Sequence, residues 1–479
     1  MLTMLLWLVA IYLLASIVIG LLSARKVHNA KDYITAGRNL PLPMVLAMVF
    51  ATWFGAETVL GISATFLESG FRGLISDPLG ASICLVIFGL VFARPLYRMN
   101  LLTLGDFFRI RYNKQTEMIL SLCIVISYLG WVAAQVTALG LVFNVLSYDA
   151  ISQTQGMLIG STVVLLYTLF GGMWSVAITT FVQMIVIVIG LLIVTWTAGD
   201  MAGGMSHVIS TAAAAGKFDF LPKLEWLDMV GWIAALVTMG LGSIPQQDVF
   251  ARANSSKNET VAVWGTTFGG ISYFFFAAVP LFLAYSATMI DPDLVARYIS
   301  KDSQLILPMF ILEKMPFAMQ VVFFGALLSV IMSTASGTLL APSVTFSENI
   351  LKSVVPHMSD RTFLWATKLT VACFASIVTF YAIYTDASIH AMVEHAYRIT
   401  LAGAFVPLAA GLFWKRASNL GAALAITFGL GVWLLLEFTS AELLVEPHLL
   451  GLIASFVGML LGSFMVPNKH NFDHLKMGQ

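Results

Sequence analysis

The chain has 479 residues, 59% of them hydrophobic and 10% charged, and its 25 basic and 25 acidic side chains leave no formal net charge. Soluble domains carry roughly 25% charged residues and disordered chains combine low hydrophobicity with high charge, so both classes are excluded, and no basic excess is present to bind nucleic acid. This is the composition of a polytopic helical membrane protein, whose partner is the lipid bilayer.

The first apolar run, 2–23, predicts a membrane helix rather than a cleaved signal peptide. No positive charge precedes the run, and Arg25 and Lys26 follow it. A signal peptide has the opposite charge order and a shorter apolar core.

Thirteen segments are apolar over about 20 residues, the length needed to cross the hydrocarbon core. They are 2–23, 42–66, 76–97, 117–146, 155–171, 177–198, 229–249, 261–288, 317–350, 363–384, 391–413, 419–438 and 448–466. The run 303–313 is too short for a span, and we expect it to form a surface helix before the ninth one.

The basic residues of the loops predict the orientation. Alternate loops contain most of the loop Lys and Arg residues, and the positive-inside rule assigns these loops to the cytoplasm. We therefore expect the N-terminus outside, the C-terminus in the cytoplasm, and an integral protein of a bacterial inner (cell) membrane.

The second span is predicted to unwind near its middle. Residues 50–59 read Phe-Ala-Thr-Trp-Phe-Gly-Ala-Glu-Thr-Val, with Gly55 at mid-depth and Glu57 just beyond it. An acid inside a span is costly unless the helix opens onto a protein-lined cavity. The alternative is an intact helix packed through Gly55, with Glu57 paired to a basic side chain.

The seventh span is predicted to break as well. Residues 239–248 contain two glycines and Pro245, which favour an interruption. Asp248 and Arg252 are spaced i, i+4 and are expected to form a local ion pair near the inner surface. The second and seventh spans would each be the first helix of a five-helix half. Interruptions at these matching positions are typical of inverted repeats with a midplane binding site.

The ninth span carries three hydroxyl side chains within four residues, Ser333, Thr334 and Ser336. Such residues often bond to their own helix or pack a small interface. Beside the carbonyls of an unwound helix, they would instead complete a set of hard oxygen ligands for an alkali cation.

No enzymatic motif is found. The sequence has no His-Glu-x-x-His and no Gly-x-Ser-x-Gly, and Cys84, Cys123 and Cys373 lie in apolar runs without metal-ligand spacing. We therefore expect no catalytic residues, no disulfide and no metal site other than one for sodium. A channel or a receptor built on a transporter scaffold remains an alternative.

Several stretches resemble motifs of the sodium:solute symporter family. Residues 169–183 (LFGGMWSVAITTFVQ) resemble its Gly-Gly…Thr-Asp-x-x-Gln motif, Ser333-Thr334 with 347–352 (SENILK) its ninth-span motif, and 47–61 its first core helix. The resemblance implies an all-α membrane protein with a LeuT-type fold, 13 transmembrane helices and a 5+5 inverted repeat. The parts would be an N-terminal extra helix and cytoplasmic loop (1–41), the first repeat (42–198), an extracytoplasmic loop (199–228), the second repeat (229–413), and two C-terminal helices with a tail (414–479).

The resemblance also implies sodium-coupled uptake of a small organic solute by alternating access. Carried over position by position, the sodium ion would bind the carbonyls of Ala51, Phe54 and Val330 and the hydroxyls of Ser333 and Thr334. Thr180 stands where the family motif has an Asp that some members use in a second sodium site. One sodium per substrate is therefore expected.

The substrate contacts are expected between the two breaks. Residues 51–53 and 131–134 resemble a choline-transporting branch of the family, in which aromatic rings surround a quaternary ammonium. The candidate contacts are Trp53, Glu57, Trp131 and Gln246. A quaternary amine such as choline and an amino acid such as proline are both open, with a sugar or an organic acid as the alternative.

Overall fold

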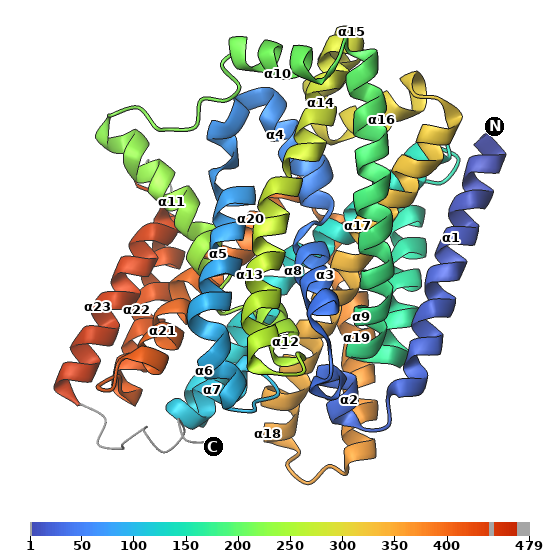
Figure 1. Ribbon diagram of the computed structural model, residues 1–479. Helices are drawn as coiled ribbons and strands as arrows, with labels where there is room; N and C mark the ends of the chain where they lie inside the picture. The colour runs from blue at the N-terminus through green and yellow to red at the C-terminus, as the bar shows by residue number, and fades with distance from the viewer. Residues whose placement is uncertain (1, 440–444, 467–479) are drawn as a thin grey trace.

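The computed structural model describes residues 2–439 and 445–466, and every regular element in this part of the chain is helical, apart from one β-bridge between Leu40 and Ser256. Long helices run between two opposite faces, and short helices lie on the faces (Figure 1).

The α-helices that run between the faces are α1 Leu2–Ser23, α3 Leu42–Trp53, α4 Ile62–Ser69, α5 Ala81–Ile87, α6 Ala93–Arg98, α8 Lys114–Leu146, α9 Gln153–Met201, α11 Trp226–Gly242, α12 Gln247–Asn254, α13 Glu259–Phe276, α14 Ala278–Ile290, α17 Phe317–Thr345, α19 Asp360–Tyr384, α20 Ile389–Thr400, α21 Val406–Phe413, α22 Asn419–Glu437 and α23 Pro447–Met465. Widened turns continue several of them, namely η3 Glu57–Gly61, η5 Ile75–Gly80, η6 Phe88–Phe92, η8 Phe346–Leu351 and η9 Leu401–Phe405. The short elements are η1 Ala24–Lys26, α2 Ala30–Thr35, η2 Ala36–Arg38, η4 Gly70–Leu74, α7 Leu104–Arg111, α10 Met205–Ala214, α15 Pro292–Ile299, η7 Ser303–Leu305, α16 Ile306–Lys314 and α18 Lys352–Val354.

The described residues form ten helices that are long and apolar enough to cross a membrane, or eleven if the bent pair α11 and α12 is counted as one span. The sequence predicted thirteen. The counts differ mainly because the predicted spans 155–171 and 177–198 both lie within α9, and because Glu57–Arg98 forms one run that contains the third predicted span and the end of the second. The all-helical membrane architecture is confirmed, and the thirteen spans stay a prediction.

Gly172 divides the long helix α9 where a loop was predicted. A straight helix of 49 residues would measure about 73 Å, more than twice the thickness of the hydrocarbon core. At Gly172 the backbone takes φ 50° and ψ −136°. A Cβ atom there would lie 2.4 Å from the carbonyl oxygen of Tyr33, so this turn requires glycine.

The loops and short helices lie at two opposite faces (Figure 1). In Figure 1 the helix α1 starts at the top face and reaches the bottom one, where α2, α7 and α18 lie. The short helix α16, predicted as a surface helix at 303–313, lies near the top face with α10 and α15. The basic loops that contain α2, α7 and α18 lie at the bottom face, which the charge rule predicts to be cytoplasmic.

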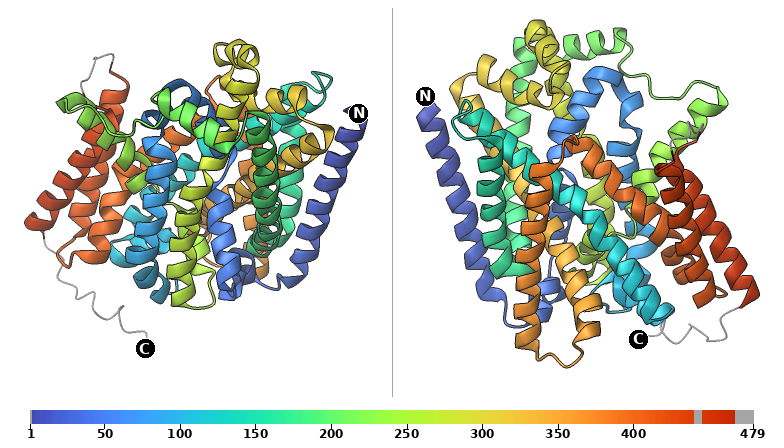
Figure 2. Two further views of the ribbon diagram at one scale, coloured as in Figure 1. Left: turned by 45° about the horizontal axis from the view of Figure 1, so that its top comes forward. Right: turned by 180° about the vertical axis from the view of Figure 1, so that it is seen from behind.

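The centre of the molecule is built around α3. The helices α8, α9, α13, α17 and α20 surround this region, whereas α1 lies at one edge and α22 with α23 at the other (Figure 2). The side chains of α3 from Ala47 to Trp53 are all buried, and the candidate site lies where this helix ends.

Candidate functional site

The predicted interruption of the second span is present. Helix α3 ends at Trp53, Phe54 has the non-helical angles φ −84° and ψ 73°, and helical turns resume at Glu57. The last carbonyls of a helix have no partner within it, so the break frees main-chain oxygens in the middle of the protein. The alternative of an intact helix through Gly55 is wrong.

Gln135 of α8 holds the chain directly after this break. Its Oε1 atom accepts the backbone N–H of Ala56 at 3.0 Å, and its Nε2 donates to Glu57 at 2.7 Å. The other oxygen of Glu57 accepts from Nε1 of Trp131 at 3.1 Å. Glu57 is 2% exposed, and its hydrogen-bond donors are neutral, so the basic partner that the alternative required is not found among the described residues.

Four of the five predicted sodium ligands bring oxygen atoms together. The Ser333 hydroxyl lies 3.0 Å from the carbonyl oxygen of Ala51 and 2.9 Å from that of Val330. The Thr334 hydroxyl lies 3.2 Å from the same Ala51 oxygen. Each hydroxyl donates its proton here, and rotation about its C–O bond would turn a lone pair toward the shared point.

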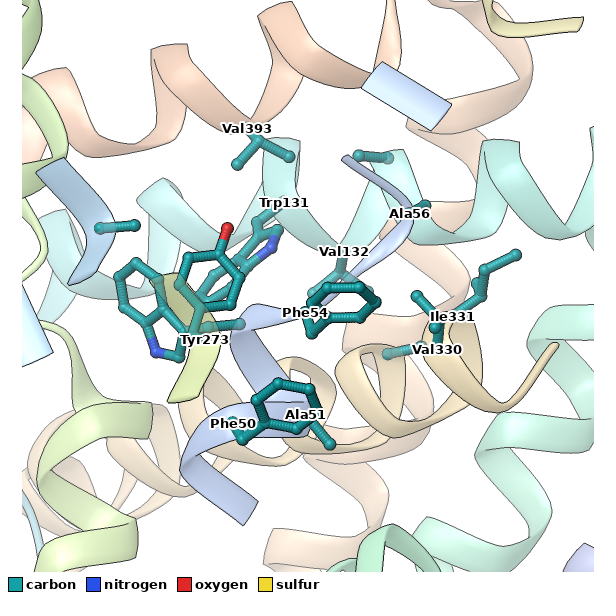
Figure 3. Packing of buried hydrophobic residues seen from close by; sticks show 14 of the residues in the cluster. Phe50, Ala51, Phe54, Ala56, Trp131, Val132, Tyr273, Val330, Ile331 and Val393 are labelled. Carbon is teal, nitrogen blue, oxygen red and sulfur yellow. The ribbon is translucent and has the colours of Figure 1, made fainter. Parts of the chain in front are cut away.

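Phe54, the fifth predicted ligand, lies in the break itself. Figure 3 shows Ala51 and Phe54 on the broken helix opposite Val330 on α17. The ring of Phe54 stacks on Phe50 at 5.3 Å and contacts Tyr273 at 6.2 Å. This packing holds Phe54 in its non-helical conformation. Its carbonyl therefore does not point along the helix axis as the carbonyls of α3 do.

Three aromatic rings from three helices meet beside Glu57. The ring centre of Trp53 lies 5.5 Å from Trp131 and 5.9 Å from Tyr397, and those of Trp131 and Tyr397 are 5.5 Å apart. Tyr128 stacks on Trp131 at 5.9 Å. Nε1 of Trp53 and the hydroxyl of Tyr397 are buried and have no hydrogen-bond partner in the described part of the chain. Two of these rings, Trp53 and Trp131, were predicted from the sequence.

A second buried acid, Asp77, was missed by the sequence analysis. It lies in η5, is 1% exposed and accepts a hydrogen bond from the Tyr273 hydroxyl. Tyr273 also contacts the Thr58 hydroxyl at 3.1 Å, which donates to the carbonyl of Trp53 at 3.2 Å. Asp77 is therefore linked to the broken helix, and an acid at the start of an apolar run was the signal that could have revealed it.

Gln246 lies at the second break. The helices α11 and α12 are bent by 45°, and Gln246 precedes α12. Its Nε2 donates to the hydroxyls of Ser127 at 3.0 Å and Thr400 at 3.2 Å. These partners are close in sequence to Tyr128 and Tyr397, so Gln246 borders the aromatic cluster, with its side chain already bonded to protein.

The ion pair expected between Asp248 and Arg252 is not the contact observed. Arg252 donates to the backbone carbonyl of Asp248 at 2.8 Å and to the Thr52 hydroxyl at 3.1 Å, while the carboxylate of Asp248 accepts from Tyr128. Both residues are at most 1% exposed, so they are buried among other helices of the protein. A Cβ at Gly337 would come within 2.0 Å of the Arg252 guanidinium, which explains the glycine there.

Thr180, which replaces the acid of the family motif, is fully buried on α9. Its hydroxyl has no hydrogen-bond partner among the described residues. The Ser336 hydroxyl donates to the carbonyl of Ser333 at 3.1 Å. This region thus has neutral oxygens where the motif has a carboxylate.

The sequence profile of the sodium:solute symporter family matches residues 33–429, so the chain belongs to this family. The human high affinity choline transporter 1 is 26% identical over 448 residues, which cover 88% of this chain and 75% of that protein. The sodium/proline symporter of Haemophilus influenzae is 24% identical over 444 residues, with 88% and 85% covered. A solved Na+-coupled sialic acid symporter, in its substrate-bound outward-open state, superposes with a TM-score of 0.84 at 19% identity, over 98% of this chain and 99% of that one.

These comparisons confirm the transporter fold, the family and the function at the level of the family. The protein is a sodium-coupled symporter of a small solute, and its coupling ion is sodium. The family is one of transporters and not of enzymes.

The hydrogen bond between Glu57 and Gln135 is expected to appear as coupling between the two side chains. A bond to a charged group contributes about 1.5–3 kcal/mol, and Glu57→Leu and Gln135→Leu each remove the same bond. The double variant, measured in detergent, should lose less free energy of unfolding than the two single variants added together, and the difference should be about that amount. The control is Glu68→Leu, an exposed acid of α4, whose effect should add to that of Gln135→Leu within about 0.5 kcal/mol. Additive losses for Glu57 and Gln135 would contradict the bond.

Proposed function

We propose that the protein takes up a small organic cation together with one sodium ion by alternating access. The proposal includes thirteen spans in a 5+5 inverted repeat, with the N-terminus outside a bacterial inner membrane and the C-terminus in the cytoplasm. It is supported by the two broken helices, α3 and the pair α11–α12, which begin the two predicted repeats and border one central cluster. Inverted repeats place binding sites at such breaks.

The sodium ion would bind where α3 ends against α17. Its proposed ligands are the carbonyls of Ala51, Phe54 and Val330 and the hydroxyls of Ser333 and Thr334. The distances of 2.9–3.2 Å between these hydroxyls and the carbonyls of Ala51 and Val330 support this assignment, because hard cations prefer several neutral or anionic oxygens around one point.

The charge of the core carries the proposal of a cationic substrate. Glu57 and Asp77 are both buried beside the broken helix, and their side-chain donors are the neutral groups of Trp131, Gln135 and Tyr273. A buried carboxylate without a cation is costly. One sodium ion and one cationic substrate would together match these two carboxylates.

The aromatic cluster favours an amine over a sugar or an organic acid. The faces of Trp and Tyr rings attract cations by about 0.5–2 kcal/mol each, and Trp53, Trp131 and Tyr397 present three such rings next to Glu57. The rings contact one another, so a bound cation would have to separate them. An anionic substrate would meet the Glu57 carboxylate beside these rings.

The substrate proposal predicts a ranking in sodium-dependent uptake by proteoliposomes. Choline-like cations should be taken up in preference to proline and betaine, and sugars and organic acids should not be taken up. Trp53→Ala and Glu57→Gln should each raise the half-saturating concentration of the cation at least tenfold, because each removes an attraction for positive charge. Glu68→Gln on the neighbouring helix α4 is the matched control and should have no effect. Saturable uptake of sugars or organic acids alone would refute the proposal.

The sodium assignment predicts a separate phenotype for the α17 hydroxyls. Ser333→Ala and Thr334→Ala should each raise the sodium concentration required for half-maximal uptake, since one oxygen ligand is lost. Thr338→Ala, one turn further along α17, removes a hydroxyl that donates to the carbonyl of Thr334 and serves as the control. Unchanged sodium dependence in the Ser333/Thr334 double variant would exclude this site.

The neutral environment of Thr180 predicts one sodium ion per substrate. Desolvating a second sodium ion against neutral oxygens alone would be costly. The coupling ratio can be read from reversal potentials in proteoliposomes as the sodium gradient is varied at a fixed substrate gradient, and each charge moved contributes about 2.3 kcal/mol per 100 mV. Thr180→Ala should leave this ratio and the sodium affinity unchanged. A ratio of two sodium ions per substrate would contradict the proposal that the neutral region around Thr180 holds no second sodium ion.

A further inference from the structure

The helices α1, α2, α9 and α19 meet at the bottom face of Figure 1, away from the site described above. The backbone N–H of Ala30 in α2 donates to Asp360 at the start of α19 at 3.2 Å. The Tyr33 hydroxyl donates to the carbonyl of Leu169 in α9 at 3.2 Å. The short helix α2 therefore joins α9 and α19 at this corner, directly after the end of α1.

Two lysines of this corner face aromatic rings. Nζ of Lys26 lies 4.5 Å from the ring centre of Trp174. The rings around Nζ of Lys368 lie at 5.3–5.8 Å and belong to Tyr33, Phe170 and Trp365. Within residues 2–439 and 445–466, neither lysine forms an ion pair with a carboxylate. We call Lys26, Lys368 and these four rings the basic corner.

The neighbouring charges leave the basic corner positive. Further exposed cations lie next to it in the sequence at Arg25, Lys31 and Arg361. The acids nearby are Asp32, which accepts the backbone N–H of His28 at 3.2 Å, and Asp360, which accepts that of Ala30. Both carboxylates are thus already engaged by the backbone.

The depth of Lys368 matches that of a lipid headgroup. It lies eight residues after the start of α19, a rise of about 12 Å. Helical side chains lean toward the N-terminus, which in α19 is the bottom face, so the ammonium reaches back toward the membrane surface. Trp365 and Phe170 are 61% and 41% exposed, as expected for rings at the boundary between acyl chains and headgroups.

We propose that the basic corner binds the phosphate of an anionic phospholipid from the leaflet at this face, with Lys26 and Lys368 as the cations that contact it. The acyl chains would lie along the exposed rings of Phe170 and Trp365. A single lysine near a helix end is solvated by water and by headgroups of any kind, so it would show no preference among lipids. Two ammonium groups without a carboxylate partner, each over rings of this one corner, favour a net negative headgroup, and basic pockets between helices on the cytoplasmic side bind such lipids.

Native mass spectrometry of the full chain, released from detergent, tests the proposal with phosphatidylglycerol and phosphatidylcholine of identical acyl chains. The unaltered protein should bind phosphatidylglycerol more tightly. Lys26→Gln and Lys368→Gln should each weaken that binding about fivefold, and the double variant roughly 25-fold, with little change for phosphatidylcholine. Lys368→Arg should retain the preference, because it keeps the charge.

Lys257→Gln is the matched control, since it removes an exposed lysine of the same face outside the basic corner. It should change the binding less than twofold. Each variant must elute as a monodisperse peak and retain sodium-dependent uptake, which separates lipid binding from folding. Equal affinities for the two lipids, or an equal loss in Lys257→Gln, would overturn the proposal. Competition by millimolar glycerol phosphate would overturn it as well, because the ligand would then be a free phosphate and not a lipid.

Discussion

The interruption of α3 between Trp53 and Glu57 is the constraint on which the rest of the core depends. In a membrane protein each unsatisfied backbone group costs several kcal/mol, so the groups freed by the break need partners from other helices. The hydroxyls of Ser333 and Thr334 reach the carbonyl of Ala51, and Gln135 accepts the N–H of Ala56. The break in α3 therefore requires polar residues on α8 and α17 that bond to its backbone.

The same contacts connect the proposed ion and substrate sites. Ala51 and Trp53 are two residues apart on the last turn of α3, so a cation held by the Ala51 carbonyl would bind the same turn that carries the Trp53 ring. Gln135 binds the backbone on the far side of the break and the Glu57 carboxylate at once. A change at either site alters the shape of one short segment, which is a physical basis for coupling two ligands.

The parts of the site predicted from the sequence are those that a single helix reveals. The length of the apolar runs indicated the spans. Gly55 and Glu57 indicated the break, because a glycine and an acid inside a span destabilise that helix whatever its neighbours are. Trp53, Glu57 and Trp131 do lie together. The rings of Tyr397 and Tyr128 were not predicted as part of the cluster, since their contacts join helices far apart in the sequence.

The errors have physical reasons as well. The spacing of Asp248 and Arg252 suggested a local ion pair, but Thr52 and Tyr128 from other helices offer buried partners that the spacing does not show. The loop expected between 155–171 and 177–198 is nearly absent, because the positive φ of Gly172 lets the chain turn within α9. Local patterns predict where a helix is strained, whereas the partner that relieves the strain is set by tertiary packing.

The second break extends this reasoning to the bottom face. Gln246 binds Ser127 and Thr400 beside the aromatic cluster. The next residue, Gln247, accepts the backbone N–H of Leu104 in α7 at 2.9 Å.

In the same region the Asn349 amide donates to Asp106 at 2.9 Å and to Glu117 at 3.0 Å. These bonds join α7, α8 and η8 at the bottom face. In the proposed transport cycle, release of the solute at that face would require these bonds to separate. Because Gln246 and Gln247 are adjacent, a movement of α12 that loosens the contacts around the proposed substrate site would also pull on these bonds.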